Sequence, residues 1–227
     1  MTGVLAEAAG VLAASPTRLP RWRAENDLRR RCAKHGAIAL TYDDGPGRRV
    51  TPRVLELLRE YDAHATFYLL GSRALEAPEV VDHIAAGGHE LGCHGFAHVN
   101  ALTVSRSSAA RDIEQGYEAL SPWLPRDGAF RPPFGKIRPH TWRELRRRGA
   151  PVGWWTIDSR DSLFESLDVD AVVAETERAG GGVVLLHDFD RGAADAAREQ
   201  YTLSLTEALL ALARRRGWLT TTQSALP

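Results

Sequence analysis

Two histidines, His94 and His98, stand four positions apart in the segment GCHGFAHVN. If this segment forms a helical turn, both imidazoles face one side and can bind the same metal ion. The metalloprotease pattern H-E-x-x-H does not explain the spacing, because His89-Glu90 is followed by His94 at the wrong distance. Two surface histidines would show the same spacing, so a metal site requires a third ligand from elsewhere in the chain.

Asp43 and Asp44 can provide this third ligand, since zinc binds both carboxylate and imidazole groups. Adjacent residues of a strand normally point to opposite faces. Gly45-Pro46 follows directly and ends the strand, which allows both carboxylates to reach one pocket. Asp-Asp-Gly-Pro is also typical of an ordinary turn, and its composition does not separate the two interpretations.

From Ala37 onward, short apolar runs alternate with longer helical patterns, which predicts parallel βα units. The predicted strands are Ala37–Tyr42, Ala65–Leu70, Glu90–Cys93, Ala129–Arg131, Val152–Ile157, Val183–Leu186 and Trp218–Thr221. The predicted helices are Thr51–Tyr61, Glu79–Ala86, Arg106–Leu120, Thr141–Arg148, Val169–Arg178 and Leu203–Arg216. No linker or repeat divides this pattern, which favours a single α/β barrel or barrel-like sheet.

Polar clusters follow five of the predicted strands. They are Asp43-Asp44, His94 with His98, Arg131, Asp158 to Asp161, and His187-Asp188. In βα barrels the carboxyl ends of the strands carry the active site, whereas the opposite end serves stability. Loops are polar in most proteins, but histidine and aspartate at so many strand ends indicate a catalytic face.

The composition is that of an ordinary globular protein, with 227 residues of which 44% are hydrophobic and 26% charged. These values exclude disordered, collagen-like and disulfide-rich classes. The 29 basic and 29 acidic residues balance, so the basic excess of a nucleic-acid-binding protein is absent. Cys32 and Cys93 form no C-x-x-C pair, and we expect both to be free thiols.

No run of apolar residues is long enough for a membrane-spanning helix. The N-terminal segment MTGVLAEAAGVLAASP is unlike a signal peptide, because no basic residue precedes Arg18 and Glu7 interrupts the apolar part. We expect a short amphipathic helix there and a cytoplasmic location. The pattern divides the chain into an N-terminal helical extension, residues 1–36, and a main domain, residues 37–227.

Five motifs occur in order along the chain: TYDDGP at 41–46, HGFAH at 94–98, RPPFG at 131–135, DSRD at 158–161 and LLH at 185–187. In this combination the sequence resembles the polysaccharide deacetylases, the NodB-homology domain, which are metal-dependent carbohydrate esterases. The resemblance implies a distorted (β/α) barrel of about seven parallel strands, with the active site at their carboxyl ends. It also implies hydrolysis of an N-acetyl, sometimes an O-acetyl, group on a sugar.

The resemblance assigns a metal site and a base. Asp44, His94 and His98 match the ligands of a divalent metal, commonly Zn²⁺, with Co²⁺ or another divalent ion as alternatives. Asp43 matches the general base and Arg131 the group that holds it. The donor set also makes chemical sense by itself, because three protein ligands leave one position of a catalytic zinc site open for water.

The resemblance further assigns an acid and an oxyanion donor. His187 matches the general acid that protonates the leaving amine, and Asp161 matches the residue that orients it. A histidine with a carboxylate partner can supply a proton near neutral pH. The backbone N–H of Phe134 matches the donor that stabilises the oxyanion.

Tyr42, Pro133 and Trp155 are the candidate substrate-binding residues. Trp155 follows Trp154, and because strand neighbours face opposite sides, at least one of this pair is expected to pack inside. Tyr42 stands in the first motif, and Pro133 stands beside the matched oxyanion donor.

Four positions depart from the usual pattern of the family, of which Tyr42 and Phe134 only exchange one aromatic residue for another. Gly95 stands where Ser or Thr is common, which removes a hydroxyl between the two histidine ligands. Ser162 replaces a frequent Trp, which alters one wall of the substrate groove. These departures leave the substrate open, because a small or lipid-linked sugar fits an altered groove as well as a polymer does.

Two further hypotheses concern the reaction. The first is hydrolysis of a non-sugar amide, as in allantoinase-like members of the same superfamily, which share these motifs. The second is a non-catalytic carbohydrate-binding protein, which would lack a ligand, the base or the acid, whereas all are present in this sequence. We expect a carbohydrate as the partner and no nucleic acid. The sequence predicts no oligomeric state.

Overall fold

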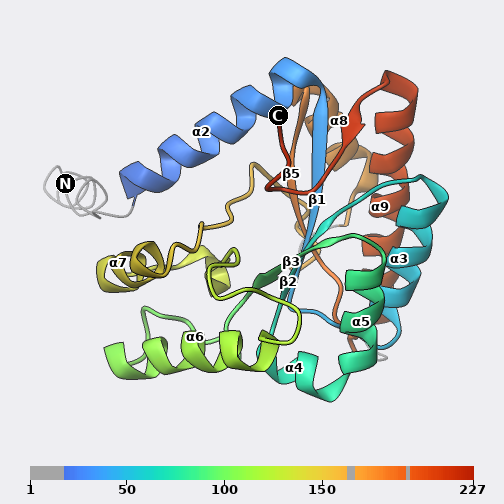
Figure 1. Cartoon of the computed structure of the whole chain (residues 1–227). Helices are drawn as coiled ribbons and strands as arrows, with labels where there is room; N and C mark the ends of the chain where they lie inside the picture. Colours follow the sequence, from blue (N-terminus) through green and yellow to red (C-terminus); the bar gives the residue numbers. More distant parts are fainter. Residues whose placement is uncertain (1–17, 163–166, 193–194) are drawn as a thin grey trace, which may run out of the picture.

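The computed structural model describes residues 18–162, 167–192 and 195–227. A parallel sheet forms its centre, with the strand order β3-β2-β1-β5-β4, and β6 pairs with the start of β1 (Figure 1). The strands are β1 (Ala37–Asp43), β2 (Thr66–Leu69), β3 (Glu90–Cys93), β4 (Ile157–Asp158), β5 (Gly181–His187) and β6 (Leu219–Thr220). Every pairing between these strands is parallel, as the alternating pattern predicts.

Two irregular segments close this sheet into a distorted barrel. Phe130 forms single parallel bridges to Cys93 on one side and to Val152 on the other. The segment that starts at Val152 continues into β4, which pairs with β5. The predicted strands Ala129–Arg131 and Val152–Ile157 are therefore not regular strands over most of their length, and each is represented mainly by an isolated bridge. Pro132 and Pro151 lie beside these bridges, and proline has no N–H for a regular ladder.

Helices surround the sheet, and each of the six helices predicted between residues 51 and 216 is present. The observed helices are α2 (Arg18–His35), α3 (Val50–Glu60), α4 (Gly71–Glu76), α5 (Pro78–Ala86), α6 (Arg106–Leu120), α7 (Pro139–Arg148), α8 (Val169–Ala179) and α9 (Ala196–Arg216), with a 3₁₀ turn η1 (Pro133–Gly135). Helix α9 begins earlier than predicted, and α4 was not predicted. Across the described residues, none of these helices is long and apolar enough to cross a membrane.

Helix α2 lies against β5 and β1, within the predicted N-terminal extension (Figure 1). It packs through a narrow stripe formed by Ala24, Leu28 and Cys32, one helical turn apart from one another. Charged residues surround this stripe, which explains why the apolar spacing was not recognised in the sequence. The amphipathic helix predicted nearer the N-terminus lies outside the described residues.

The two faces of β1 separate the hydrophobic core from the interior of the barrel. The even-numbered residues from Ile38 to Tyr42 belong to the main core. The odd-numbered residues from Ala37 to Asp43 point to the opposite face. Those side chains are small up to Thr41, which leaves room in the interior for the fully buried Arg131.

Asp190, in the loop after β5, caps the N-terminus of α3. Its carboxylate accepts hydrogen bonds from the backbone N–H groups of Arg48, Arg49 and Val50, at 2.9, 3.0 and 3.0 Å. The helix has no cap from its own preceding residue, since Arg49 makes no capping hydrogen bond through its side chain. The cap therefore joins the loop after β5 to the loop after β1.

Replacing Asp190 by alanine should lower the free energy of unfolding by about 1 kcal/mol, because the first turn of α3 loses its acceptor. Urea denaturation followed by circular dichroism measures this change. Asp127→Ala, which removes an exposed loop carboxylate, is the control and should change stability by less than half as much. Equal losses in the two variants would show that Asp190 is not a helix cap.

Candidate metal centre and active site

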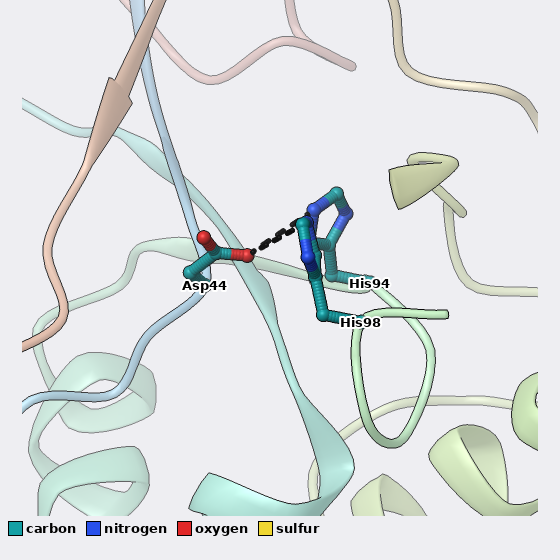
Figure 2. A group of neighbouring side chains, drawn as sticks. All are labelled: Asp44, His94 and His98. Carbon is teal, nitrogen blue, oxygen red and sulfur yellow. Dashed lines mark ion pairs between the residues drawn. The ribbon is translucent and has the colours of Figure 1, made fainter. Parts of the chain in front are cut away.

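Asp44, His94 and His98 converge at the carboxyl ends of β1 and β3, with both rings facing the carboxylate (Figure 2). The Oδ1 atom of Asp44 lies 3.4 Å from Nε2 of His94 and 3.3 Å from Nε2 of His98. Ligand atoms placed tetrahedrally at about 2.0–2.1 Å from zinc are about 3.4 Å apart. The separations observed here are thus those of a set of metal ligands.

These residues can bind a cation only if His94 is neutral and has a lone pair available. Burial lowers the pKa of His94 to about 3, although the charge of Asp44 opposes this, so the ring is neutral at neutral pH. A carbonyl oxygen can only accept, and therefore Nδ1–H of His94 donates to the carbonyl of Arg131, at 2.7 Å. This bond leaves a lone pair on Nε2 that faces Asp44.

The environment of the Asp44 carboxylate also fits a bound cation. Its Oδ1 atom is buried and has no hydrogen-bond partner among the described residues. A carboxylate oxygen and an unprotonated nitrogen repel each other at 3.4 Å unless a cation lies between them. Nitrogen and oxygen donors of this kind suit a divalent transition metal, so the three residues fit such an ion.

A loop, not the predicted helical turn, brings the two histidines together. Residues 94–98 form a bend, in which Gly95 and His98 have φ angles of 85° and 56°. Asp112 of α6 accepts a hydrogen bond from the N–H of Ala97 at 2.8 Å and so fixes the loop. A Cβ atom at Gly95 would collide with the Asp112 carboxylate. Glycine at this position therefore makes room for the group that organises the loop.

The backbone of Asp44 explains how two adjacent carboxylates reach one site. Strand β1 ends at Asp43, and Asp44 has a left-handed backbone with φ 68°. Strand alternation therefore no longer applies to its side chain. Oδ2 of Asp43 lies 3.7 Å from Nε2 of His94, beside the Asp44 carboxylate. Both carboxylates meet at the cluster, as the Gly45-Pro46 break suggested.

Arg131 holds Asp43 from inside the barrel. Its Nη1 donates to Oδ1 of Asp43 at 2.8 Å and to Oγ1 of Thr41 at 2.7 Å. These contacts leave Oδ2 of Asp43 as the oxygen beside the histidine cluster. Burial raises the pKa of Asp43 above its ordinary value, although the charge of Arg131 opposes this rise.

Gln223 accepts a further hydrogen bond from Arg131. This residue was not identified from the sequence. Its Oε1 accepts hydrogen bonds from Nη2 of Arg131 and from the hydroxyl of Tyr68, both at 2.9 Å. The backbone N–H of Gln223 donates to Oγ1 of Thr66 at 2.8 Å. A glutamine outside every motif carries no sequence signal, because only the path of the C-terminal segment brings it to the barrel interior.

His187 and Asp161 form a second buried pair. Nδ1–H of His187 donates to Oδ1 of Asp161 at 2.6 Å, and the backbone N–H of His187 donates to Oδ2 at 2.8 Å. Thr202 of α9, which carried no motif, donates to the same Oδ2 at 3.0 Å. Burial disfavours the charged ring, but Asp161 outweighs it and raises the pKa of His187 to about 9. The imidazole therefore carries a proton at neutral pH.

Phe134 borders the ligand cluster on the loop before α7. Its φ and ψ angles are 57° and 11°, a left-handed conformation that is strained for a residue with a Cβ atom. Its ring centre lies 4.4 Å from that of His98, and the side chain is 55% exposed. The loop thus presents both an unusual backbone and an open aromatic ring beside the site.

The side chains of the three residues predicted to contact substrate are buried or covered by other groups. Tyr42 faces away from Asp43 by strand alternation, stacks on Phe67 and shares a hydrogen bond with Thr206. It is fully buried, and that prediction is wrong for its side chain. Pro133, the first residue of η1, is also buried and offers no open contact.

Trp155 is only half-buried, but a guanidinium covers its ring, with the Cζ atom of Arg21 5.0 Å from the ring centre. Trp154 is buried, as expected for one of the two tryptophans. Trp155 therefore packs between the barrel and α2, and its contact with substrate stays a prediction.

Gly95→Ser should destabilise the ligand loop, although serine is common at this position in the family. The added Cβ collides with Asp112, and the left-handed backbone adds strain, together about 1–3 kcal/mol. Thermal unfolding and zinc titration should both show a loss relative to the parent. Gly192→Ser is the control, since a Cβ there meets none of the described atoms within 4 Å. A Gly95→Ser protein with parental stability and zinc affinity would refute this account of the loop.

Comparisons with known proteins agree with this geometry. The sequence model of the family described as polysaccharide deacetylase matches residues 30–153. A peptidoglycan-N-acetylglucosamine deacetylase of Bacillus cereus is 34% identical over 177 residues, which are 76% of this chain and 79% of that protein. A chitooligosaccharide deacetylase of Sinorhizobium fredii is 30% identical over 156 residues, 67% of this chain and 72% of that protein.

Some other relatives are longer, and the chain spans only 33% and 34% of the length of two peptidoglycan deacetylases, from Listeria monocytogenes and Bacillus subtilis. Among solved structures, the Bc1960 peptidoglycan N-acetylglucosamine deacetylase superposes with a TM-score of 0.75 at 25% identity, covering 86% of this chain and 89% of that one. The family match covers more than half of the sequence, and the fold and the order of the motifs agree with it. The chain belongs to the polysaccharide deacetylase family.

Proposed function

We propose that this protein is a metal-dependent deacetylase that hydrolyses the N-acetyl group of an amino sugar in a glycan. The observation that carries the proposal is the cluster of Asp44, His94 and His98 with Asp43 beside it. The charged His187–Asp161 pair supplies a proton donor from β5. One relative is named for peptidoglycan N-acetylglucosamine and another for chitooligosaccharides, which supports an N-acetylated glycan as the substrate.

Asp44, His94 and His98 would hold a divalent cation, and their donor atoms favour zinc. Cobalt or another divalent ion would suit the same nitrogen and oxygen donors. When bound, such an ion lowers the pKa of a water molecule and polarises the acetyl carbonyl. The neutral His94, with Nδ1–H fixed by a backbone carbonyl, is ready to bind through Nε2.

Asp43 acts as the general base in this proposal. Arg131 occupies its Oδ1, so Oδ2 is the atom that accepts a proton from the attacking water. A carboxylate whose pKa is raised by burial holds that proton better than an ordinary one. The backbone N–H of Phe134 donates to the oxyanion that develops on the acetyl carbonyl.

His187 acts as the general acid. Its Nδ1–H is engaged by Asp161, so the proton on Nε2 is the one given to the leaving nitrogen. Because Asp161 keeps the ring protonated at neutral pH, the acid is in its active form before the substrate binds. Asp43 and His187 thereby perform opposite proton transfers at the same pH.

The exposed ring of Phe134 fits a carbohydrate substrate. Aromatic rings offer an apolar face against which the C–H face of a sugar packs. Phe134 is 55% exposed and the His98 side chain 28% exposed, so the site is open at this side. A sugar resting on this ring would place its acetyl group beside the ligand cluster.

The alternatives from the sequence are weaker. The relatives reported above are named for sugar deacetylation, and no observation favours an allantoinase-like reaction on a non-sugar amide. A non-catalytic binding role does not explain why ligands, base and acid are all oriented for chemistry. The cytoplasmic location and the domain boundary after residue 36 stay predictions.

The zinc-loaded protein should release acetate from oligomers of N-acetylglucosamine. Asp43→Asn should retain zinc but lose roughly 100-fold or more in kcat, because an amide cannot accept the proton. His94→Ala should lose both zinc and activity. Acetate assays and metal analysis of the same preparations measure these effects. The absence of acetate release from every N-acetylated glycan tested would overturn the proposed function, and parental turnover in Asp43→Asn would reject the base.

Asp161→Asn should move the alkaline limb of the kcat/KM profile to lower pH. In the parent, activity falls as pH rises and His187 loses its proton. Removing the neighbouring negative charge lowers the pKa of His187, and the limb should shift by about 1–3 units. Asp158→Asn, in the same motif, is the control and should leave the limb in place. An unchanged limb in Asp161→Asn would mean that another group is the acid.

A further inference from the structure

Helix α2 reaches the loop that carries Phe134. Arg21, near the start of this helix, donates Nη1–H to the carbonyl oxygen of Gly135 at 3.0 Å. The two residues are 114 positions apart in the sequence. The family match begins at residue 30, so Arg21 lies upstream of the matched region. Figure 1 shows this end of α2 extending toward the side of the barrel where α7 lies.

Arg21 is fixed by contacts of its own. Its Nε donates to Oε1 of Glu25, one turn further along α2, at 2.7 Å. Its Cζ atom lies 4.7 Å from the ring centre of Trp154 and 5.0 Å from that of Trp155. A planar guanidinium that stacks on aromatic rings and pairs with a carboxylate has few alternative orientations. The hydrogen bond to Gly135 therefore comes from a donor that is already held in place.

The loop that accepts this hydrogen bond has a strained backbone, which contacts from neighbouring residues must stabilise. Phe134 and Gly135 have consecutive left-handed φ angles of 57° and 61°. For a residue with a Cβ atom, this conformation costs about 1–3 kcal/mol and persists only where the surroundings impose it. Arg21 and Trp155 lie so close to Gly135 that an added Cβ would collide with both. On the other side of the loop, the Phe134 ring rests against His98.

We infer that Arg21 is a positioning residue that holds the Phe134 N–H in the direction of the developing oxyanion. It fixes the carbonyl of Gly135, which is one end of a two-residue left-handed segment whose other end is that N–H. The inference rests on the proposed function, in which Phe134 supplies the oxyanion donor. It gives the N-terminal helix a part in catalysis in addition to packing.

An oxyanion donor acts mainly in the transition state, so its displacement lowers kcat and leaves KM nearly unchanged. Complete removal of such a donor costs about 100–1000-fold in kcat. Arg21→Met keeps the apolar stem but removes the donors, and the displaced loop should lower kcat by roughly 10-fold or more. Zinc content should remain that of the parent. Arg21→Lys retains a cationic donor and should recover part of the loss.

Arg29→Met is the matched control on the same helix. Arg29 also joins α2 to the barrel, through a hydrogen bond from Nη2 to the carbonyl of Thr156 at 3.5 Å. This contact lies away from the loop of Phe134, so kcat and KM should stay at the parental values. Glu25→Gln, which loosens Arg21 without removing it, should lower kcat in the same direction by a smaller factor. If Arg21→Met folds poorly, the decrease in kcat of Glu25→Gln still tests the role of Arg21.

Hydrogen–deuterium exchange in the metal-free protein provides a readout that does not depend on activity. Peptides that cover residues 133–137 should exchange faster in Arg21→Met than in the parent or in Arg29→Met. If no glycan is deacetylated, the proposed function fails, whereas the exchange still tests the support of the loop. The inference is wrong if exchange in this loop is unchanged, if Arg21→Met keeps the parental kcat, or if Arg29→Met loses as much.

Discussion

Oδ1 of Asp44 and the unprotonated Nε2 of His94 repel each other where the three ligand side chains meet at the end of the barrel, and the rest of the site depends on holding them there. Oδ1 of Asp44 stands 3.3–3.4 Å from two imidazole nitrogens, and the neighbouring side chains provide it with no hydrogen bond within the described part of the chain. Left-handed backbone at Asp44 and His98 adds strain to this repulsion. The cost is offset by the buried core of the barrel and, when a cation binds the folded state, by the binding free energy.

Two buried charge pairs flank this cluster and give each catalytic side chain one free atom. Arg131 occupies Oδ1 of Asp43 and leaves Oδ2, while Asp161 occupies Nδ1 of His187 and leaves Nε2. The environments also favour opposite proton transfers, since burial makes Asp43 a better proton acceptor and Asp161 keeps His187 charged. Such a difference between two titratable groups is how one site carries out acid and base steps at the same pH.

The sequence predicted those parts of the molecule that follow a period or a motif. Strand alternation and helical spacing located the barrel, and polar clusters after the strands located its catalytic face. Contacts between distant segments were not predictable from these patterns. Asp112, Gln223 and Arg21 act through hydrogen bonds to residues that only the fold brings near. For Tyr42 the prediction was wrong for another reason. Its place in a motif suggested contact with substrate, but strand alternation directs its side chain into the core, where it shares a hydrogen bond with Thr206.

The central claim is that Asp44, His94 and His98 form one metal centre, and anomalous diffraction at the zinc edge tests it most directly. Crystals grown with one equivalent of zinc should show a single strong peak within about 2.0–2.2 Å of Oδ1 of Asp44 and Nε2 of both histidines. If zinc density appeared only at other positions, with these three side chains still converging as they do here, the account of the site would be contradicted.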